Sequence, residues 1–375
     1  MAADVAGLQR RARMLLAREV YDYYAGGAGR ERTLRANEEA WRRPWLAPRV
    51  LRDVSAVSTG AQLLGRPLAT PVAVAPVGFQ GQAHPGGEVA AASGAAQAGA
   101  LFVLSTRSSC RIEDVAQAVA AAGGTWWFQV YVLRDRELTA GLVRRAAAAG
   151  ARALVLTADT PVVGRKRRDM SDGLVSDEEY LVNLGPLDDL SRSGQDPAVT
   201  AADIGWLAGI SGGLPVVVKG VLRPGDARAC ARAGAAAVIV SNHGGRQLDG
   251  AVPSALALPG VAAALAPAGL PAYADGGIRT GEDVLTALAL GAAAVFVGRP
   301  VLWALACGGA GGVRDLLVAL TGDLAHAMAL AGAPGLAQIR GLAVPTAAAG
   351  VPPAAADAAA AGVPPAADDT AAAPE

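Results

Sequence analysis

Histidine, cysteine and net charge are all scarce in this 375-residue chain. It has three histidines and three cysteines, and its 33 Lys and Arg residues balance 33 Asp and Glu residues, so the formal net charge is +0. This balance gives no reason to expect a nucleic acid or an anionic membrane surface as a partner. The odd number and wide separation of Cys110, Cys230 and Cys307 predict neither a disulfide framework nor a zinc site, and they favour a reducing cytoplasm.

The chain also lacks the patterns of exported and membrane proteins. Arg10, Arg11, Arg13 and Arg18 interrupt the apolar residues near the N-terminus, so we expect no signal peptide. Gly, Pro and charged residues interrupt the Ala-rich segments, so we expect no membrane span. Apolar residues still make up 52% of the chain, enough for a large core. These features predict a soluble cytoplasmic protein.

Eight short apolar runs alternate with Ala-rich helical stretches from residue 71 onwards. The runs are hydrophobic throughout rather than alternating, which is typical of parallel strands covered by helices. The predicted strands are 71–75, 101–104, 126–130, 153–156, 215–218, 235–240, 271–274 and 293–297, and helices are expected at 87–98, 112–122, 134–149, 224–233, 254–266 and 281–290. Eight β-then-α units over about 230 residues predict an α/β protein with the (β/α)8 TIM-barrel fold. A doubly wound sheet, the alternative, would normally have fewer strands and a glycine-rich turn after the first.

Other segments do not follow this alternation of strands and helices. Residues 5–25 predict an amphipathic helix that ends at a pair of glycines, and residues 28–58 are expected to be an extended cover segment. The long polar connection at about 160–205 favours a partly mobile lid over a disordered insertion. The barrel domain should therefore span residues 1–342. Residues 343–375 are mostly Ala, Pro, Gly and Asp, cannot bury enough apolar surface to order themselves, and predict a disordered tail.

Residues 241–250 (SNHGGRQLDG) directly follow the sixth predicted strand, and His243 has the richest polar surroundings of the three histidines. Glycines let the backbone come close to a ligand. An imidazole such as that of His243 titrates near neutrality, and the guanidinium of Arg246 can hold a carboxylate through two parallel hydrogen bonds. Taken alone, the stretch could be a polar turn with a hydrogen-bonded histidine. Similar polar ends on the other strands favour a functional site.

Polar or glycine residues follow all eight predicted strands. In a (β/α)8 barrel these ends meet on one face, where the active sites of this fold lie. The set comprises Pro76, Val77, Gly78, Ser105, Arg107, Gln129, Tyr131, Thr157, Asp159, Lys219, Ser241, His243, Asp275, Gly277, Arg279, Gly298 and Arg299. One lysine at a strand end is commonly a snorkelling side chain, but that does not explain a whole ring of such residues. We therefore predict an active site on this rim.

The residue types on the rim indicate a phosphate at one side and a flat heterocycle beside it. Gly277, Arg279, Gly298 and Arg299 follow the seventh and eighth strands, which is the usual phosphate position of this barrel. Donors and acceptors suited to a heterocycle come from Ser105, Gln129, Thr157, Lys219 and Ser241. Asp159 can orient His243 and stabilise its charged form, so His243 can act as a general base. Arg246 and a tyrosine could hold a substrate carboxylate.

These residues resemble those of the FMN-dependent α-hydroxy acid oxidase and dehydrogenase family, which includes glycolate oxidase, lactate oxidase and mandelate dehydrogenase. The resemblance covers roughly residues 5–340, and its most specific part is 241–249. The other matching segments are 21–28 (YDYYAGGA), 128–131 (FQVY), 157–161 (TADTP), 218–220 (VKG), 275–279 (DGGIR) and 297–300 (VGRP). The resemblance implies FMN as cofactor, oxidation of an (S)-2-hydroxy acid to the 2-oxo acid, and a homo-oligomer such as a tetramer.

The resemblance also implies roles for single residues. His243 would be the base, Asp159 its partner, Tyr131 a hydrogen-bond partner of the substrate hydroxyl, and Arg246 with Tyr23 the carboxylate clamp. Lys219 would lie by the flavin N1–C2 carbonyl. The rest of the cofactor would contact Pro76, Val77, Gly78, Ser105, Gln129, Thr157, Ser241 and Asp275, and its phosphate Gly277, Arg279, Gly298 and Arg299.

Three positions leave substrate and electron acceptor open. Lys166 stands where the family usually has a second arginine. It would help to bind substrate, but its ammonium group cannot make the two parallel hydrogen bonds of a guanidinium to a carboxylate. Arg107 stands at a position that often carries an apolar residue facing the substrate side chain, so it suggests a polar substituent or else points to solvent. Gly78, expected beside the flavin N5, should leave room for a bulky substrate. Oxygen, a quinone or a carrier protein could each reoxidise the flavin.

Two other functions remain open on the sequence. Another FMN barrel enzyme, such as a type 2 isopentenyl diphosphate isomerase, would explain the glycines at the phosphate end but not His243, Arg246 and Tyr23 together. A catalytically degenerate flavin-binding barrel would account for the departures at Lys166 and Arg107.

Overall fold

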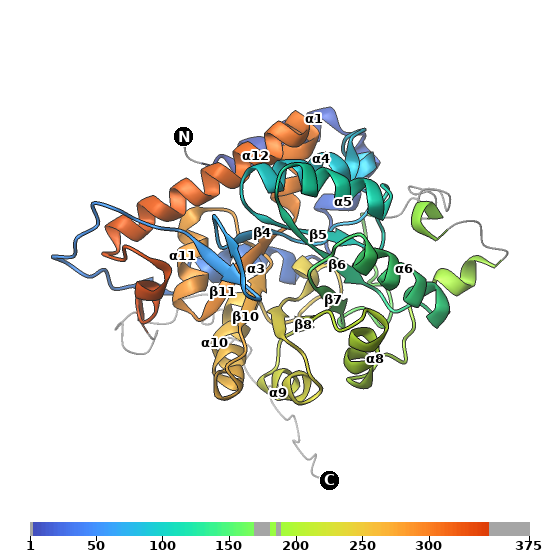
Figure 1. Ribbon diagram of the computed structural model, residues 1–375. Helices are drawn as coiled ribbons and strands as arrows, with labels where there is room; N and C mark the ends of the chain where they lie inside the picture. The colour runs from blue at the N-terminus through green and yellow to red at the C-terminus, as the bar shows by residue number, and fades with distance from the viewer. Residues whose placement is uncertain (1–2, 169–180, 185–188, 345–375) are drawn as a thin grey trace, which may run out of the picture.

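Eight parallel strands close into a barrel in the computed structural model, which describes residues 3–168, 181–184 and 189–344. Going round the barrel, the strand order is β10-β11-β4-β5-β6-β7-β8-β9 (Figure 1). The bounds are β4 Val72–Val74, β5 Leu101–Ser105, β6 Thr125–Val130, β7 Leu154–Thr157, β8 Val216–Val221, β9 Ala237–Val240, β10 Ala272–Asp275 and β11 Ala292–Val297. The predicted (β/α)8 fold is confirmed, and each predicted strand overlaps an observed one.

A helix follows each barrel strand and covers its outer face. These helices are α4 Gly87–Gln97, α5 Ile112–Ala121, α6 Arg136–Ala148, α8 Ala202–Ile210, α9 Pro224–Arg232, α10 Ser254–Leu265, α11 Gly281–Ala289 and α12 Arg299–Leu330. All six predicted barrel helices are confirmed. The structure adds α8 and α12, so the last residues of the segment predicted as a lid (160–205) belong to a barrel helix. Residues 169–180 and 185–188 of that segment lie outside the described residues.

Helix α12 is long and apolar enough to cross a membrane by length and composition alone, a property that buried helices of a protein core share. It is kinked at Gly308 and Gly309, whose backbone angles are not helical. Half of its most apolar window is buried inside the molecule, and it packs along α4 and along α1 (Val5–Leu15) (Figure 1). Its apolar residues therefore serve the packing of the barrel wall.

The barrel interior is filled by large aromatic side chains. Trp127, Tyr273 and Phe296 are each about 1% exposed, and their ring centroids lie 5.8–6.1 Å apart. A short hairpin, β2 (Ala61–Leu63) and β3 (Arg66–Leu68), packs Leu63 against this interior cluster. The same cluster contains residues at the beginnings of the strands, so the hairpin covers the amino-terminal end of the barrel and leaves the carboxyl end for the polar ring.

The N-terminal region contains three helices rather than one helix and an extended segment. The predicted helix over residues 5–25 is interrupted at Ala17, which separates α1 from α2 (Arg18–Ala25). The prediction that residues 28–58 are extended is wrong for α3 (Arg32–Trp41). The buried residues of α3 are Thr33, Asn37, Ala40 and Trp41, which share one helical face although two of them are polar. This polar content hid the helical period.

The C-terminal boundary differs slightly from the predicted one. Residues Ala343–Val344 form β12, which pairs antiparallel with β1 (Trp45–Leu46). The first two residues of the predicted tail are therefore ordered against the N-terminal region. The remainder of the tail, 345–375, lies outside the described residues.

Short 3-10 turns lie at Gln80–Gln82, Leu181–Asn183, Leu190–Ser193, His243–Gly245, Ala266–Ala268 and Leu336–Ile339.

Replacing Leu63 by alanine tests the packing of the hairpin on the barrel. Leu63 is 1% exposed, and removing a buried leucine side chain costs about 2–5 kcal/mol. Leu63→Ala should lower the free energy of unfolding by that amount in urea denaturation. Leu330→Ala is the matched control because Leu330 is 69% exposed. Equal stability of the two variants would show that the hairpin does not seal the core.

Candidate active site

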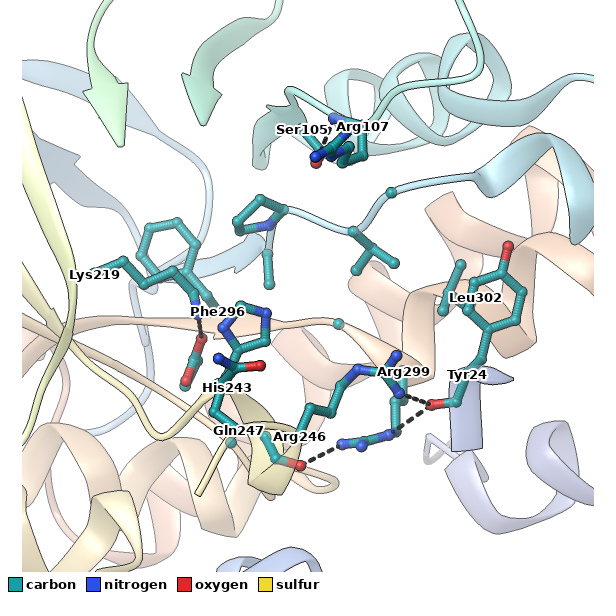
Figure 2. Close-up of a pocket in the computed structure, with 18 of the residues that line it drawn as sticks. Tyr24, Ser105, Arg107, Lys219, His243, Arg246, Gln247, Phe296, Arg299 and Leu302 are labelled. Atoms are coloured by element: carbon teal, nitrogen blue, oxygen red, sulfur yellow. Dashed lines mark hydrogen bonds and ion pairs between the residues drawn. The ribbon is translucent and has the colours of Figure 1, made fainter. Parts of the chain in front are cut away.

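The polar residues at the strand ends converge on one cavity of about 490 Å³. Figure 2 shows side chains of Lys219, His243, Arg246 and Arg299 directed into the same space. Of the residues predicted from sequence, the following line the cavity: Tyr23, Pro76, Val77, Gly78, Ser105, Arg107, Tyr131, Lys166, Lys219, His243, Arg246, Asp275, Gly277, Arg279, Gly298 and Arg299. They come from segments up to 276 residues apart (299 minus 23), so only the closed barrel brings them together.

Gln129, Thr157, Asp159 and Ser241 were also predicted at the site but lie behind the cavity wall. Gln129 is 1% exposed; its Oε1 accepts from Ser105 Oγ at 3.0 Å, and its Nε2 donates to Thr157 Oγ1 at 2.9 Å. It therefore links the ends of three neighbouring strands. Ser241 Oγ likewise accepts from the Lys219 ammonium at 2.9 Å and from the His243 backbone N–H at 3.0 Å. In this structure these side chains hold the lining residues in place.

His243 and Asp159 form the hydrogen-bonded pair predicted for a base and its partner. His243 Nδ1 lies 3.0 Å from Asp159 Oδ1, and the side chains are 22% and 13% exposed. His243 has a left-handed backbone, with φ at 59°, in the turn that follows β9. Burial raises the pKa of Asp159, but the nearby His243 and Lys219 outweigh it and hold that pKa below its usual value. Asp159 is thus a carboxylate at neutral pH and can stabilise a protonated imidazole.

Lys219 is a buried cation with two anionic neighbours. Its Nζ lies 3.1 Å from Asp275 Oδ2, and the two side chains are 4% and 8% exposed. Burial lowers the pKa of Lys219, but the charges of Asp275 and Asp159 outweigh burial and raise it. Lys219 therefore keeps its positive charge beside the cavity.

Arg246 and Arg299 are both fixed to the carboxyl end of α2. Arg246 donates to Tyr23 O at 2.6 Å and Gly26 O at 2.9 Å, and Arg299 donates to Tyr24 O at 3.0 Å and Gly26 O at 3.0 Å. Figure 2 shows both guanidiniums reaching the backbone of Tyr24. The last carbonyls of a helix carry partial negative charge, so this end of α2 holds two cations close together.

The pKa of Arg299 falls to about 9 because the guanidinium is buried and faces Arg246 and Arg279. A buried cation among cations favours an anion in the adjoining cavity. Arg299 is also the first residue of α12, with Gly298 as its cap, and the start of a helix attracts phosphate. The donor set therefore fits the phosphate of FMN, with Arg279, Gly298 and Arg299 beside it.

Two tyrosines, Tyr23 and Tyr131, line the cavity that His243 also lines. The Arg246 guanidinium lies 5.1 Å from the centre of the Tyr23 ring, which places both predicted carboxylate ligands side by side. The pKa of Tyr131 is raised by burial and by the negative charge of Asp159. Tyr131 therefore keeps its phenolic proton and can donate a hydrogen bond.

Gly78 lines the cavity, but the side on which a Cβ would lie faces Arg107 rather than open space. A Cβ at Gly78 would lie 2.8 Å from Arg107 Cβ and 2.9 Å from Arg107 O. The expectation that this glycine leaves room for a bulky substrate is therefore wrong in this structure: it lets two loops approach. Arg107 lines the cavity and donates to Ser193 O at 3.1 Å. Lys166 also lines the cavity, and its Nζ donates to Gly164 O at 3.2 Å.

Sequence reasoning missed several residues that build the site. Asn37 of α3 and Asn242 exchange two side-chain hydrogen bonds at 2.9 and 2.7 Å, fixing the turn that carries His243. Glu88 is fully buried and accepts hydrogen bonds from the loops before α4 and after β5. Gln247 was part of the matching stretch without a role, yet it lines the cavity. No local sequence pattern indicates a role for Asn37, because its partner Asn242 is distant in sequence. The same holds for Glu88, because its partners Gln80 and Ser109 belong to no motif.

Together, the barrel, the buried cations and the histidine–aspartate pair define a flavin-dependent oxidoreductase. Residues 12–345 match the model of the FMN-dependent dehydrogenase family, and the chain belongs to this family. FMN is its cofactor.

Curated relatives include a 4-hydroxymandelate oxidase from Amycolatopsis orientalis, 44% identical over 351 residues, covering 90% of this chain and 97% of the relative. A peroxisomal (S)-2-hydroxy-acid oxidase from Oryza sativa subsp. japonica is 43% identical, with 90% and 94% covered. An L-lactate oxidase from Nostoc sp. is 44% identical, with 88% and 94% covered. These relatives support oxidation of a CH–OH donor over the isomerase alternative.

Solved structures of mandelate oxidase superimpose closely on this chain. One with (S)-2-phenylpropionate gives a TM-score of 0.83 at 44% identity, covering 91% of this chain and 97% of the other. A variant with a C4a-OH-FMN adduct gives 0.81 at 44% identity, covering 89% and 97%.

Replacing Arg299 by methionine tests the phosphate assignment. Each hydrogen bond to a charged group contributes about 1.5–3 kcal/mol, so Arg299→Met should weaken FMN binding roughly ten- to a hundredfold. Flavin content after dialysis, read from absorbance, measures this loss. Arg314→Met is the control, because Arg314 lies on the same helix with its side chain 46% exposed. Full flavin retention in both variants would contradict the assignment.

Proposed function

We propose that this protein oxidises an (S)-2-hydroxy acid to the corresponding 2-oxo acid. The observation that supports this most is the His243–Asp159 pair at 3.0 Å beside a cavity lined by Arg246, Tyr23 and Tyr131. That arrangement provides a base, a carboxylate clamp and a hydroxyl partner around one substrate position. Bound FMN supplies the acceptor for the two electrons that leave the substrate.

Each side chain has a task in this reaction. Arg246 and Tyr23 bind the substrate carboxylate, and the Tyr131 hydroxyl donates to the substrate oxygen. His243 Nδ1 is bonded to Asp159, so Nε2 is the ring nitrogen left to take a proton from the substrate. The carboxylate of Asp159 then stabilises the imidazolium, and its lowered pKa keeps it charged for this purpose. Because its folded-state pKa is depressed, its contribution to stability is present above its unfolded pKa and is lost as the pH falls through the folded value.

The electron acceptor and the substrate side chain are finer parts of the same proposal. The named relatives are oxidases, which supports molecular oxygen as the species that reoxidises the flavin. Arg107 and Lys166 add positive charge to the substrate side of the cavity, which supports a side chain with a polar group. Gln195, whose Oε1 is buried without a hydrogen-bond partner among the described residues, lines the same cavity.

We also propose that the protein works as a homo-oligomer in the cytoplasm. The three cysteines are free and partly buried, which supports a reducing compartment. Exposed apolar residues such as Trp45, Val50 and Leu51 supply surface for contacts between subunits.

His243→Ala tests the base directly. The variant should retain FMN, because His243 has no part in the phosphate site, and should lose flavin reduction by a 2-hydroxy acid by about 10²–10⁴-fold. Anaerobic stopped-flow absorbance gives the rate. His326→Ala is the matched control, since His326 is exposed on α12. Reduction at a near-normal rate in His243→Ala would refute the assignment of the base.

Arg246→Lys tests the carboxylate clamp. Lysine keeps the charge but cannot make two parallel hydrogen bonds, so KM for the 2-hydroxy acid should rise about tenfold or more, with a smaller change in kcat. Steady-state kinetics separate the two constants, and Arg228→Lys on the exposed side of α9 is the control. An unchanged KM in Arg246→Lys would remove Arg246 from the clamp.

A further inference from the structure

We infer that Gln247 is a positioning residue that acts through Asp159. It fastens the strap formed by residues 159–164, which begins with Asp159, to the turn that carries His243. The inference rests on the proposed function, in which the His243–Asp159 pair is the base.

The side-chain amide of Gln247 holds three points of the strap. Its Nε2 donates to the backbone oxygens of Asp159 and Val162, both at 3.0 Å. Its Oε1 accepts from the backbone N–H of Gly164 at 3.1 Å. A primary amide offers two donors and an acceptor on one planar group, and all three are used here. Neither a glutamate nor a leucine at this position could make the same set.

The strap also lies against the turn with no spare space. A Cβ on Gly164 would meet Arg246 O at 2.5 Å and Gln247 O at 2.7 Å. On the other side of Asp159, a Cβ on Gly220 would lie 2.6 Å from the Asp159 Cβ. Asp159 is therefore held between β8 and the 241–250 turn, and Gln247 supplies the side-chain bonds on the turn side.

The carboxylate of Asp159 depends on this backbone support. Its Oδ1 contacts His243, while its Oδ2 is buried without a hydrogen-bond partner in the part of the chain that the structure describes. With one side-chain hydrogen bond, the carboxylate takes its position largely from the backbone around it, which β8 and Gln247 hold on two sides. A catalytic group misplaced by about 1 Å can cost on the order of 10²-fold in rate. Loss of Gln247 should therefore weaken the base without touching the flavin.

A double-mutant cycle between Gln247 and Asp159 tests this coupling. Gln247→Leu should lower kcat/KM roughly ten- to a hundredfold, and Asp159→Asn should lower it at least as much. In the Asp159→Asn background the further loss on adding Gln247→Leu should be about twofold or less, because the residue through which Gln247 acts is already disabled. An equal factor in both backgrounds, or no effect of Gln247→Leu alone, would overturn the inference.

Two further variants separate positioning from a general loss of structure. Gln247→Glu keeps an acceptor for Gly164 but loses both donors, so its kcat/KM should be reduced in the same way with full flavin content. Gln97→Leu, an exposed glutamine on α4, should leave kcat/KM unchanged. A loss of flavin content in Gln247→Glu that matched its loss of activity would overturn the positioning role.

Hydrogen exchange gives a readout that does not depend on activity. The FMN-loaded Gln247→Leu protein should exchange faster in the peptide spanning residues 158–166, where the Gly164 N–H loses its acceptor, and Gln97→Leu should exchange as the wild type does. Unchanged exchange in Gln247→Leu would contradict the inference that Gln247 fastens residues 159–164 to the turn that carries His243. A wild-type protein that oxidised no 2-hydroxy acid would instead contradict the proposed function, so the two failures are distinguishable.

Discussion

The hydrogen bond between His243 and Asp159 is the interaction around which the carboxyl face of the barrel is arranged. The imidazole lies on a turn with a left-handed backbone after β9, and the carboxylate begins a strap after β7, from which β9 is separated by β8. Neither residue could hold this geometry alone. Ser241, Asn242 and Gln247 fix the turn and the strap through hydrogen bonds to Lys219, Asn37 and the strap backbone.

A second constraint is the concentration of cations at the end of α2. Arg246 and Arg299 share the carbonyls of residues 23–26, and burial and mutual repulsion lower the pKa of Arg299 to about 9. Such a set is costly unless anions occupy the cavity. In the proposed function, a cofactor phosphate on one side of the cavity and a substrate carboxylate on the other meet that requirement.

The sequence predicted the barrel and the site rim well because both depend on strong local signals. Continuous apolar runs mark the strands, and polar residues mark their ends, so the sequence alone places Lys219 and His243 on the rim. Elements without such signals were missed: α3 buries Thr33 and Asn37, and α12 contains Gly308 and Gly309 at its kink. The site could not be completed from sequence, because Asn37–Asn242 and Glu88 depend on contacts that only the fold creates. The effect of Gly78 was misjudged for the same reason, since the side on which its Cβ would lie faces Arg107.

The most direct test of the central claim is anaerobic mixing of the FMN-loaded wild-type protein with the (S) and (R) enantiomers of a panel of 2-hydroxy acids, followed by flavin absorbance. Rapid bleaching by at least one (S)-2-hydroxy acid, with little or none by its (R) enantiomer, and return of colour on admitting air are the results that the structure predicts. A yellow protein that no 2-hydroxy acid bleaches would contradict the account.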